Sequence, residues 1–140
     1  MTCDLRIASP EATFSLPPAR LGLAYPVEAM ADIVAAVGEQ TAKYLVYSAA
    51  RVDAVKMQSF GFLFDVIAKD DLEGRIDDLA HQIASLAPLT HKASKAAIKA
   101  TRLGETQMAK ELGDATFASE DYAEGRRAFQ EKRRPVFNGG

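Results

Sequence analysis

Near the C-terminus, the stretch SEDYAEGRRAFQEKRRP, residues 119–135, predicts a helix. Ser119 suits the N-cap, acidic residues follow in the first turn and basic residues come last, the order that a helix dipole favours. Tyr122 and Phe129 share one face, which is typical of a core or a subunit interface. Gly125 weakens the helix by about 1 kcal/mol relative to alanine, so a close backbone approach is expected there.

Helical spacing of apolar residues continues upstream of this stretch. It predicts helices over residues 27–37, 39–49, 53–60, 70–86, 88–103 and 105–112. Short strands are predicted at residues 4–8 and 62–68, with a further extended piece at 14–16, and residues 137–140 are expected to fray. The predicted class is therefore α/β, mostly helical.

Composition sets broad limits on the function. The chain has 140 residues, 48% of them hydrophobic and 26% charged, as in an ordinary globular domain. The net charge of −2 argues against binding to nucleic acid, and we expect no membrane span and no secretory leader. Cys3 is the single cysteine, so we expect a buried thiol in a reducing, cytoplasmic protein.

Charged residues are unevenly distributed along the chain. Residues 1–90 carry 12 acidic and 7 basic groups, whereas residues 91–140 carry 7 acidic and 10 basic groups. Helical spacing places four basic side chains on one face, namely Lys92, Lys95, Lys99 and Arg102. This face is either a site for a phosphorylated cofactor or a solvated surface.

Catalytic and metal-binding motifs are missing from the sequence. His81 and His91 have no cysteine or carboxylate at ligand spacing, so no metal site is predicted. We find no phosphate-binding loop and no nucleophile elbow. The chain therefore carries no self-contained catalytic motif.

Several pieces, taken in order, resemble the enoyl-CoA hydratase/isomerase (crotonase) superfamily. They are Cys3-Asp4-Leu5-Arg6-Ile7-Ala8-Ser9, Ala12-Thr13-Phe14, Pro17, Arg20-Leu21-Gly22-Leu23, Val37-Gly38, Ala42, Ala87-Pro88 and the closing residues 119–135. The resemblance covers only the C-terminal part of a family member. It implies that residues 1–69 form the end of a crotonase (ClpP-like) ββα spiral core, and that residues 70–140 form the helical region of trimer assembly.

The resemblance also implies what this chain lacks. Family members stabilise the enolate of a CoA thioester with two backbone N–H groups, while carboxylates move protons. Both N–H donors and the first hydratase glutamate would lie upstream of Cys3, and Pro18 stands where the second glutamate is expected. Glu28 is the one carboxylate in the altered loop that follows, and it is a candidate replacement acid or base.

One binding residue carries over from the family pattern. Lys132 matches a lysine that contacts the phosphate-adenosine end of CoA, often across a subunit boundary, although it also complements the helix dipole. The phenylalanine that accompanies this lysine would fall at Gly113, so no aromatic partner is expected there.

Two functions remain open at this point. The first is the C-terminal portion of an acyl-CoA enzyme, inactive by itself, with a CoA thioester as substrate, no covalently bound cofactor and a homo-oligomeric (trimeric or hexameric) assembly. The alternative is a non-catalytic oligomerisation or interaction module derived from the crotonase fold.

Overall fold

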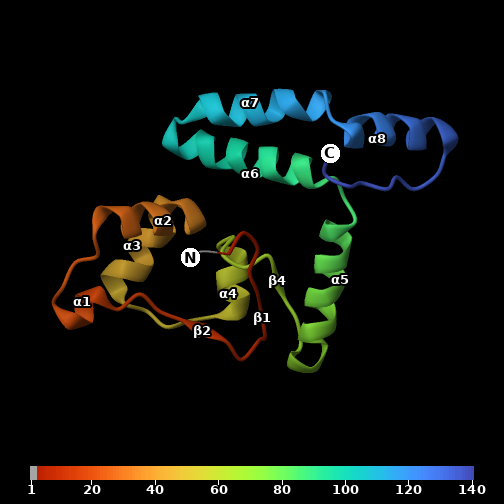
Figure 1. The fold of residues 1–140 in the computed structure, drawn as a ribbon. Helices are drawn as coiled ribbons and strands as arrows, with labels where there is room; N and C mark the ends of the chain where they lie inside the picture. The colour runs from red at the N-terminus through yellow and green to blue at the C-terminus, as the bar shows by residue number, and fades with distance from the viewer. Residues whose placement is uncertain (1–2) are drawn as a thin grey trace. The chain divides into compact units, whose positions relative to one another are not determined.

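A computed structural model describes residues 3–140 and divides the chain into two compact units, residues 1–77 (unit 1) and 78–140 (unit 2). Figure 1 shows the elements, which in chain order are β1 (Ile7–Ala8), β2 (Thr13–Phe14), α1 (Pro18–Leu21), α2 (Val27–Val37), α3 (Glu39–Ser48), β3 (Val52–Asp53), α4 (Ala54–Ser59), β4 (Asp65–Val66), the 3₁₀ turn η1 (Lys69–Asp71), α5 (Leu72–Ala84), α6 (Pro88–Leu103), α7 (Thr106–Phe117) and α8 (Glu120–Glu131). The unit boundary falls inside α5. The predicted boundary between residues 69 and 70 has a different meaning, since it divides a spiral core from an assembly region. That division stays a prediction.

The strands of unit 1 form two small ladders. β1 pairs with β4 in parallel, with Ile7 opposite Asp65, and β2 pairs with β3 in antiparallel register. The strand predicted over 62–68 is much shorter in the structure, because its partner β1 offers only two residues for pairing. The predicted burial was also only partly correct, since Leu63 is buried while Phe64 is half exposed.

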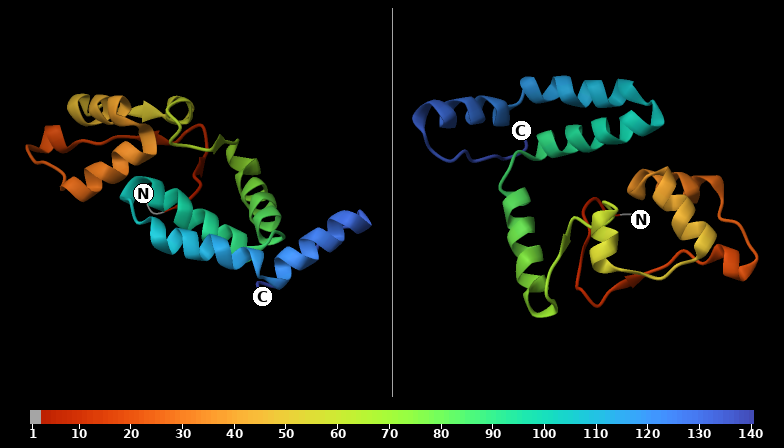
Figure 2. Two further views of the ribbon diagram at one scale, coloured as in Figure 1. Left: turned by 90° about the horizontal axis from the view of Figure 1, so that it is seen from above. Right: turned by 180° about the vertical axis from the view of Figure 1, so that it is seen from behind.

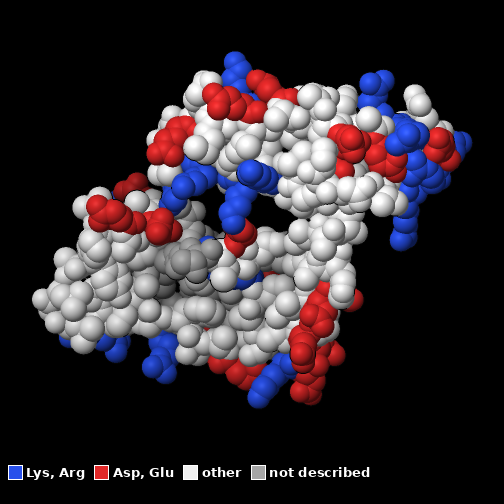
Figure 3. Space-filling model, in the orientation of Figure 1, with Lys and Arg blue, Asp and Glu red and all other residues white. Residues whose placement is uncertain are grey.

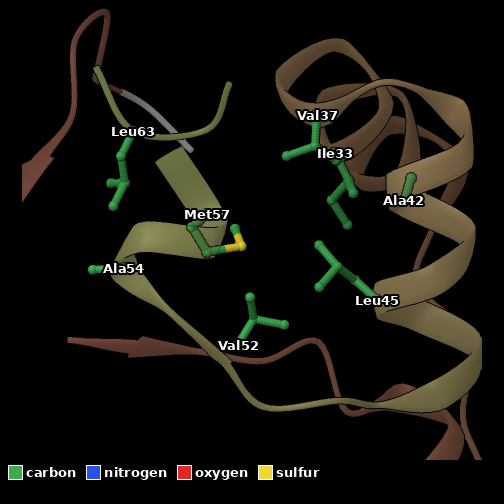
Figure 4. Close-up of a cluster of buried hydrophobic side chains, with 8 residues drawn as sticks. All are labelled: Ile33, Val37, Ala42, Leu45, Val52, Ala54, Met57 and Leu63. Carbon is green, nitrogen blue, oxygen red and sulfur yellow. The ribbon is translucent and has the colours of Figure 1, made fainter. Parts of the chain in front are cut away.

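Helices α2, α3 and α4 enclose the core of unit 1. Gly38 separates α2 from α3 with a φ of 78°, a conformation that favours glycine, and its N–H donates to Val34 O. Asp53 caps α4 by accepting the Lys56 N–H at 2.7 Å. Figure 4 shows the buried cluster, in which Ile33, Leu45 and Met57 face a common centre; its members are Ile33, Val37, Ala42, Leu45, Val52, Ala54, Met57 and Leu63.

Unit 2 contains a helical hairpin. Helices α6 and α7 run side by side in opposite directions, as Figures 1 and 2 show. Pro88 begins α6, and Gly104 ends it with a φ of 74°. The prediction for α6 is confirmed, whereas α7 extends five residues beyond the predicted end at 112, to Phe117.

Two local predictions were wrong. Cys3 is exposed, because it lies ahead of β1 and outside the buried cluster. The last residues are not frayed, because the Gly140 carbonyl accepts the Glu120 N–H at 2.8 Å and the chain returns alongside α8. Among residues 3–140, no helix is both long and apolar enough to cross a bilayer.

Candidate functional site

Helix α8 carries the sharpest sequence signal and the best-defined polar site. Its N-cap is Ser119, whose Oγ accepts the Tyr122 N–H at 3.1 Å, and its first turn holds Glu120 and Asp121. The predicted start is confirmed. The helix ends at Glu131, before the predicted basic last turn, because Lys132 adopts a left-handed conformation and terminates it.

Lys132 is exposed at this turn. Its φ is 54°, and its backbone N–H donates to Phe129 O at 3.3 Å. Phe129 lies nearly one turn earlier and is 86% exposed. An accessible aromatic ring and an ammonium group therefore lie three residues apart, a combination that suits a nucleotide's base and phosphate.

Glu124 connects α8 to the segment after it. Its two carboxylate oxygens accept Arg133 Nη1 at 2.6 Å and Nη2 at 2.9 Å, and Oε1 also accepts the Val136 N–H at 3.1 Å. Arg127 adds a bond of 2.9 Å to Oε2. Figure 3 shows acidic and basic side chains gathered together over α8. The Arg133 guanidinium, followed by the Val136 N–H, lowers the pKa of Glu124 to about 2.

This low pKa predicts that acid releases the segment after α8. A carboxyl group whose pKa is lower in the folded than in the unfolded chain stabilises the fold above its ordinary pKa. Glu124 should therefore lose its contribution as the pH falls from about 4.5 to about 2. The Val136 amide signal, followed by NMR, should shift over this interval, and Glu124→Gln should abolish the transition. An unchanged Val136 amide down to pH 2 would contradict the prediction.

Asp121 anchors the end of the chain from the first turn of α8. It is 4% exposed and accepts the Asn138 N–H at 2.8 Å and the Gly139 N–H at 3.1 Å. The ring of Phe137 lies 3.6 Å from the position that a Cβ at Gly125 would occupy. The close approach expected at Gly125 is thus made by a side chain and not by backbone.

A cavity of about 340 Å³ lies beside α8 in unit 2. Its lining includes aromatic rings, one arginine and the buried carboxylate, namely Tyr122, Phe129, Phe137, Arg126 and Asp121. Arg126 lies 5.7 Å from the Tyr122 ring centre. The stripe of Tyr122 and Phe129 is therefore not part of a core in this chain, since both rings are exposed.

Comparison with known proteins extends over the whole chain. The family model described as enoyl-CoA hydratase/isomerase matches residues 1–140. The chain belongs to the enoyl-CoA hydratase/isomerase family. A methylmalonyl-CoA decarboxylase from Escherichia coli is 32% identical over 99% of this chain and 56% of its own length. A short-chain-enoyl-CoA hydratase from Clostridium acetobutylicum is 30% identical over 96% of this chain and 53% of its own length.

Solved structures of the same family have a similar fold. An enoyl-CoA hydratase/isomerase family protein from Hyphomonas neptunium superposes with a TM-score of 0.89 at 31% identity, covering 98% of this chain and 53% of that one. An enoyl-CoA hydratase from Bacillus anthracis has a TM-score of 0.87 at 29% identity, covering 99% of this chain and 55% of that one. The chain thus spans about half the length of these relatives.

Within this enoyl-CoA hydratase/isomerase chain, the other candidate residues lie in unit 1. Pro18 is buried at the start of α1, where a ring without an N–H fits the first turn and offers no titratable group. Glu28 lies in the first turn of α2 and is exposed. The apolar cavity of unit 1, about 260 Å³ and lined by Phe14, Leu45 and Phe62 among others, does not include Glu28.

Sequence reasoning missed two residues of the site. Phe129 was assigned to a core or interface stripe, whereas the structure leaves it 86% exposed, three residues before Lys132. Glu124 pairs with Arg133 across nine positions, a separation that helix spacing does not predict. The basic face of α6 is exposed, and among residues 3–140 no cluster of three or more potential metal ligands forms.

Proposed function

We propose that this chain is the C-terminal portion of a CoA-thioester enzyme of the enoyl-CoA hydratase/isomerase family and that it is inactive by itself. One observation carries the proposal. The similarity extends over 99% of this chain but over only 56% of the E. coli decarboxylase. The remaining part of the relatives has no counterpart here, and by the resemblance it holds both oxyanion donors.

The chain's own contribution is the binding of CoA at the end of α8. Phe129 presents a ring face on which adenine stacks, and Lys132 supplies a cation for the adjacent phosphate. In a trimer or hexamer this contact serves the substrate of a neighbouring subunit. The single cysteine fits a reducing, cytoplasmic location, and no covalently attached cofactor is needed.

Pro18 limits the reactions that a complete protein would perform. A proline at this position moves no proton, so hydration by two glutamates is disfavoured. Decarboxylation of a carboxyacyl-CoA generates the same enolate without a base, because departing CO₂ leaves its electron pair on the α-carbon. This is the reaction in the E. coli relative's name, and Glu28 would be a candidate donor of the proton that the enolate then takes up.

A second function is favoured by Pro18 and by the exposed apolar residues. The chain would be a non-catalytic oligomerisation or interaction module that retains the fold without its chemistry. Leu21 and Phe117 are each 67% exposed, and Ile98 is 72% exposed, which provides surface for association. Retention of the exposed Lys132 beside Phe129 argues against this alternative.

The test is titration of the purified chain with a short enoyl-CoA and with a carboxyacyl-CoA. We expect no turnover of either thioester, because the backbone donors that stabilise the enolate are not supplied, and only weak binding at the α8 end. Robust turnover would contradict the proposal, and complete absence of CoA binding would favour the module. An in-frame, glycine-rich extension encoded upstream of Met1 would support the enzyme, whereas a stop codon there would favour the module.

A further inference from the structure

Lys132 lies in a left-handed turn at the end of α8. A φ of 54° is disfavoured for a non-glycine residue, because its Cβ then lies too close to the following carbonyl oxygen. The turn is closed by backbone bonds, in which the Arg133 N–H donates to Ala128 O at 3.0 Å. These bonds end the helix, but they do not fix the path of the backbone after Arg133.

Glu124 fixes the direction of the chain after the turn. It binds Arg133, the residue immediately after Lys132, through two bonds, and it binds the backbone of Val136 as well. Its side chain is only 14% exposed, whereas that of Arg133 is 38% exposed. The bidentate pair, together with a bond of 2.5 Å from Arg133 Nε to Glu131, holds the Arg133 side chain against α8, while the neighbouring Lys132 is exposed.

We propose that Glu124 is a positioning residue that holds Lys132 where its ammonium group meets the phosphate-adenosine end of CoA. The inference rests on the proposed CoA contact and adds the residue that prepares it. Glu124 does not touch the ligand. Its effect is to limit the orientations of the turn before the ligand arrives, which reduces the ordering that binding requires.

The experiment compares two ligands that differ by one phosphate. CoA and dephospho-CoA are titrated into the 140-residue chain, and the shifts of the Lys132 and Phe129 amides in NMR spectra give both dissociation constants. The measured quantity is the preference, the ratio of the two constants. Partial unfolding weakens the binding of both ligands by the same factor. The preference therefore reports the phosphate contact and does not change with the stability of the chain.

The direction in which the preference for CoA over dephospho-CoA changes distinguishes positioning from simple electrostatics. Glu124→Gln removes a negative charge, so simple electrostatics would raise the preference for the additional phosphate. Loss of positioning should instead lower it, by about two- to threefold, against about fivefold for Lys132→Gln. The double variant should show no further loss beyond Lys132→Gln. Glu111→Gln is the matched control, because it removes the same charge from a glutamate that contacts Gln107 and not Arg133.

Each remaining outcome separates the two proposals. If Glu124→Gln keeps or raises the preference while the wild type binds CoA, the positioning role is overturned and the CoA contact stands. If the wild-type chain shows no preference for CoA over dephospho-CoA, the phosphate contact of Lys132 fails and the inference fails with it. A fall with Glu111→Gln equal to that with Glu124→Gln would also overturn the positioning role.

Discussion

Replacement of Leu45 with alanine should lower the free energy of unfolding of unit 1 by about 3 kcal/mol, within the 2–5 kcal/mol usual for buried leucines. Leu45 lies on α3, is 2% exposed and belongs to the buried cluster with Ile33, Val37 and Met57 (Figure 4). It also borders the cavity of about 260 Å³, so truncation enlarges an existing space that neighbours do not fill. Urea denaturation of the variant should show a lower midpoint, and hydrogen exchange should accelerate in residues 27–66.

The matched control for this prediction is Leu21→Ala. Leu21 is 67% exposed, so the same truncation should change the free energy of unfolding by no more than about 0.5 kcal/mol. Equal effects of the two substitutions would contradict the assignment of the core. A Leu45 variant whose unfolding midpoint is unchanged would do the same, because it would place this side chain outside the cooperative part of unit 1.

Helices were predictable from the sequence because their signals are local. The α2 bounds, 27–37, are confirmed, since apolar spacing begins after Pro26 and Gly38 ends the run. Gly104 likewise ends α6 as predicted. Strands were predicted less well, because their length depends on a partner distant in sequence. Residues 62–68 are apolar enough for a long strand, yet only Asp65 and Val66 pair with β1.

The candidate site follows the same division. Lys132 could be proposed from a local match, and the structure shows it exposed at the end of α8. Phe129 could not be, because an aromatic residue on a helix face has the same sequence pattern whether it is buried or exposed. The contact of Glu124 with Val136 depends on the return of the chain past α8, which no periodicity predicts.

The second large effect is expected at Asp121. Asp121→Ala removes the carboxylate that accepts the Asn138 and Gly139 N–H groups. Both N–H groups then lose this hydrogen bond. Hydrogen bonds to a charged group contribute about 1.5–3 kcal/mol, so release of residues 136–140 should become easier by about 2 kcal/mol. Exchange of the Asn138 and Gly139 amides should accelerate about thirtyfold in NMR experiments.

The same substitution should loosen the start of α8, because helix and terminal segment support each other. The Ser119 hydroxyl accepts the Tyr122 N–H, whereas the Glu120 N–H donates to the Gly140 carbonyl, which stays in place only while the segment is anchored. Asp114→Ala, on the exposed side of α7, should affect neither set of amides. If the α8 amides exchange faster while those of Asn138 and Gly139 do not, Asp121 acts on the helix dipole alone and the anchoring role is wrong.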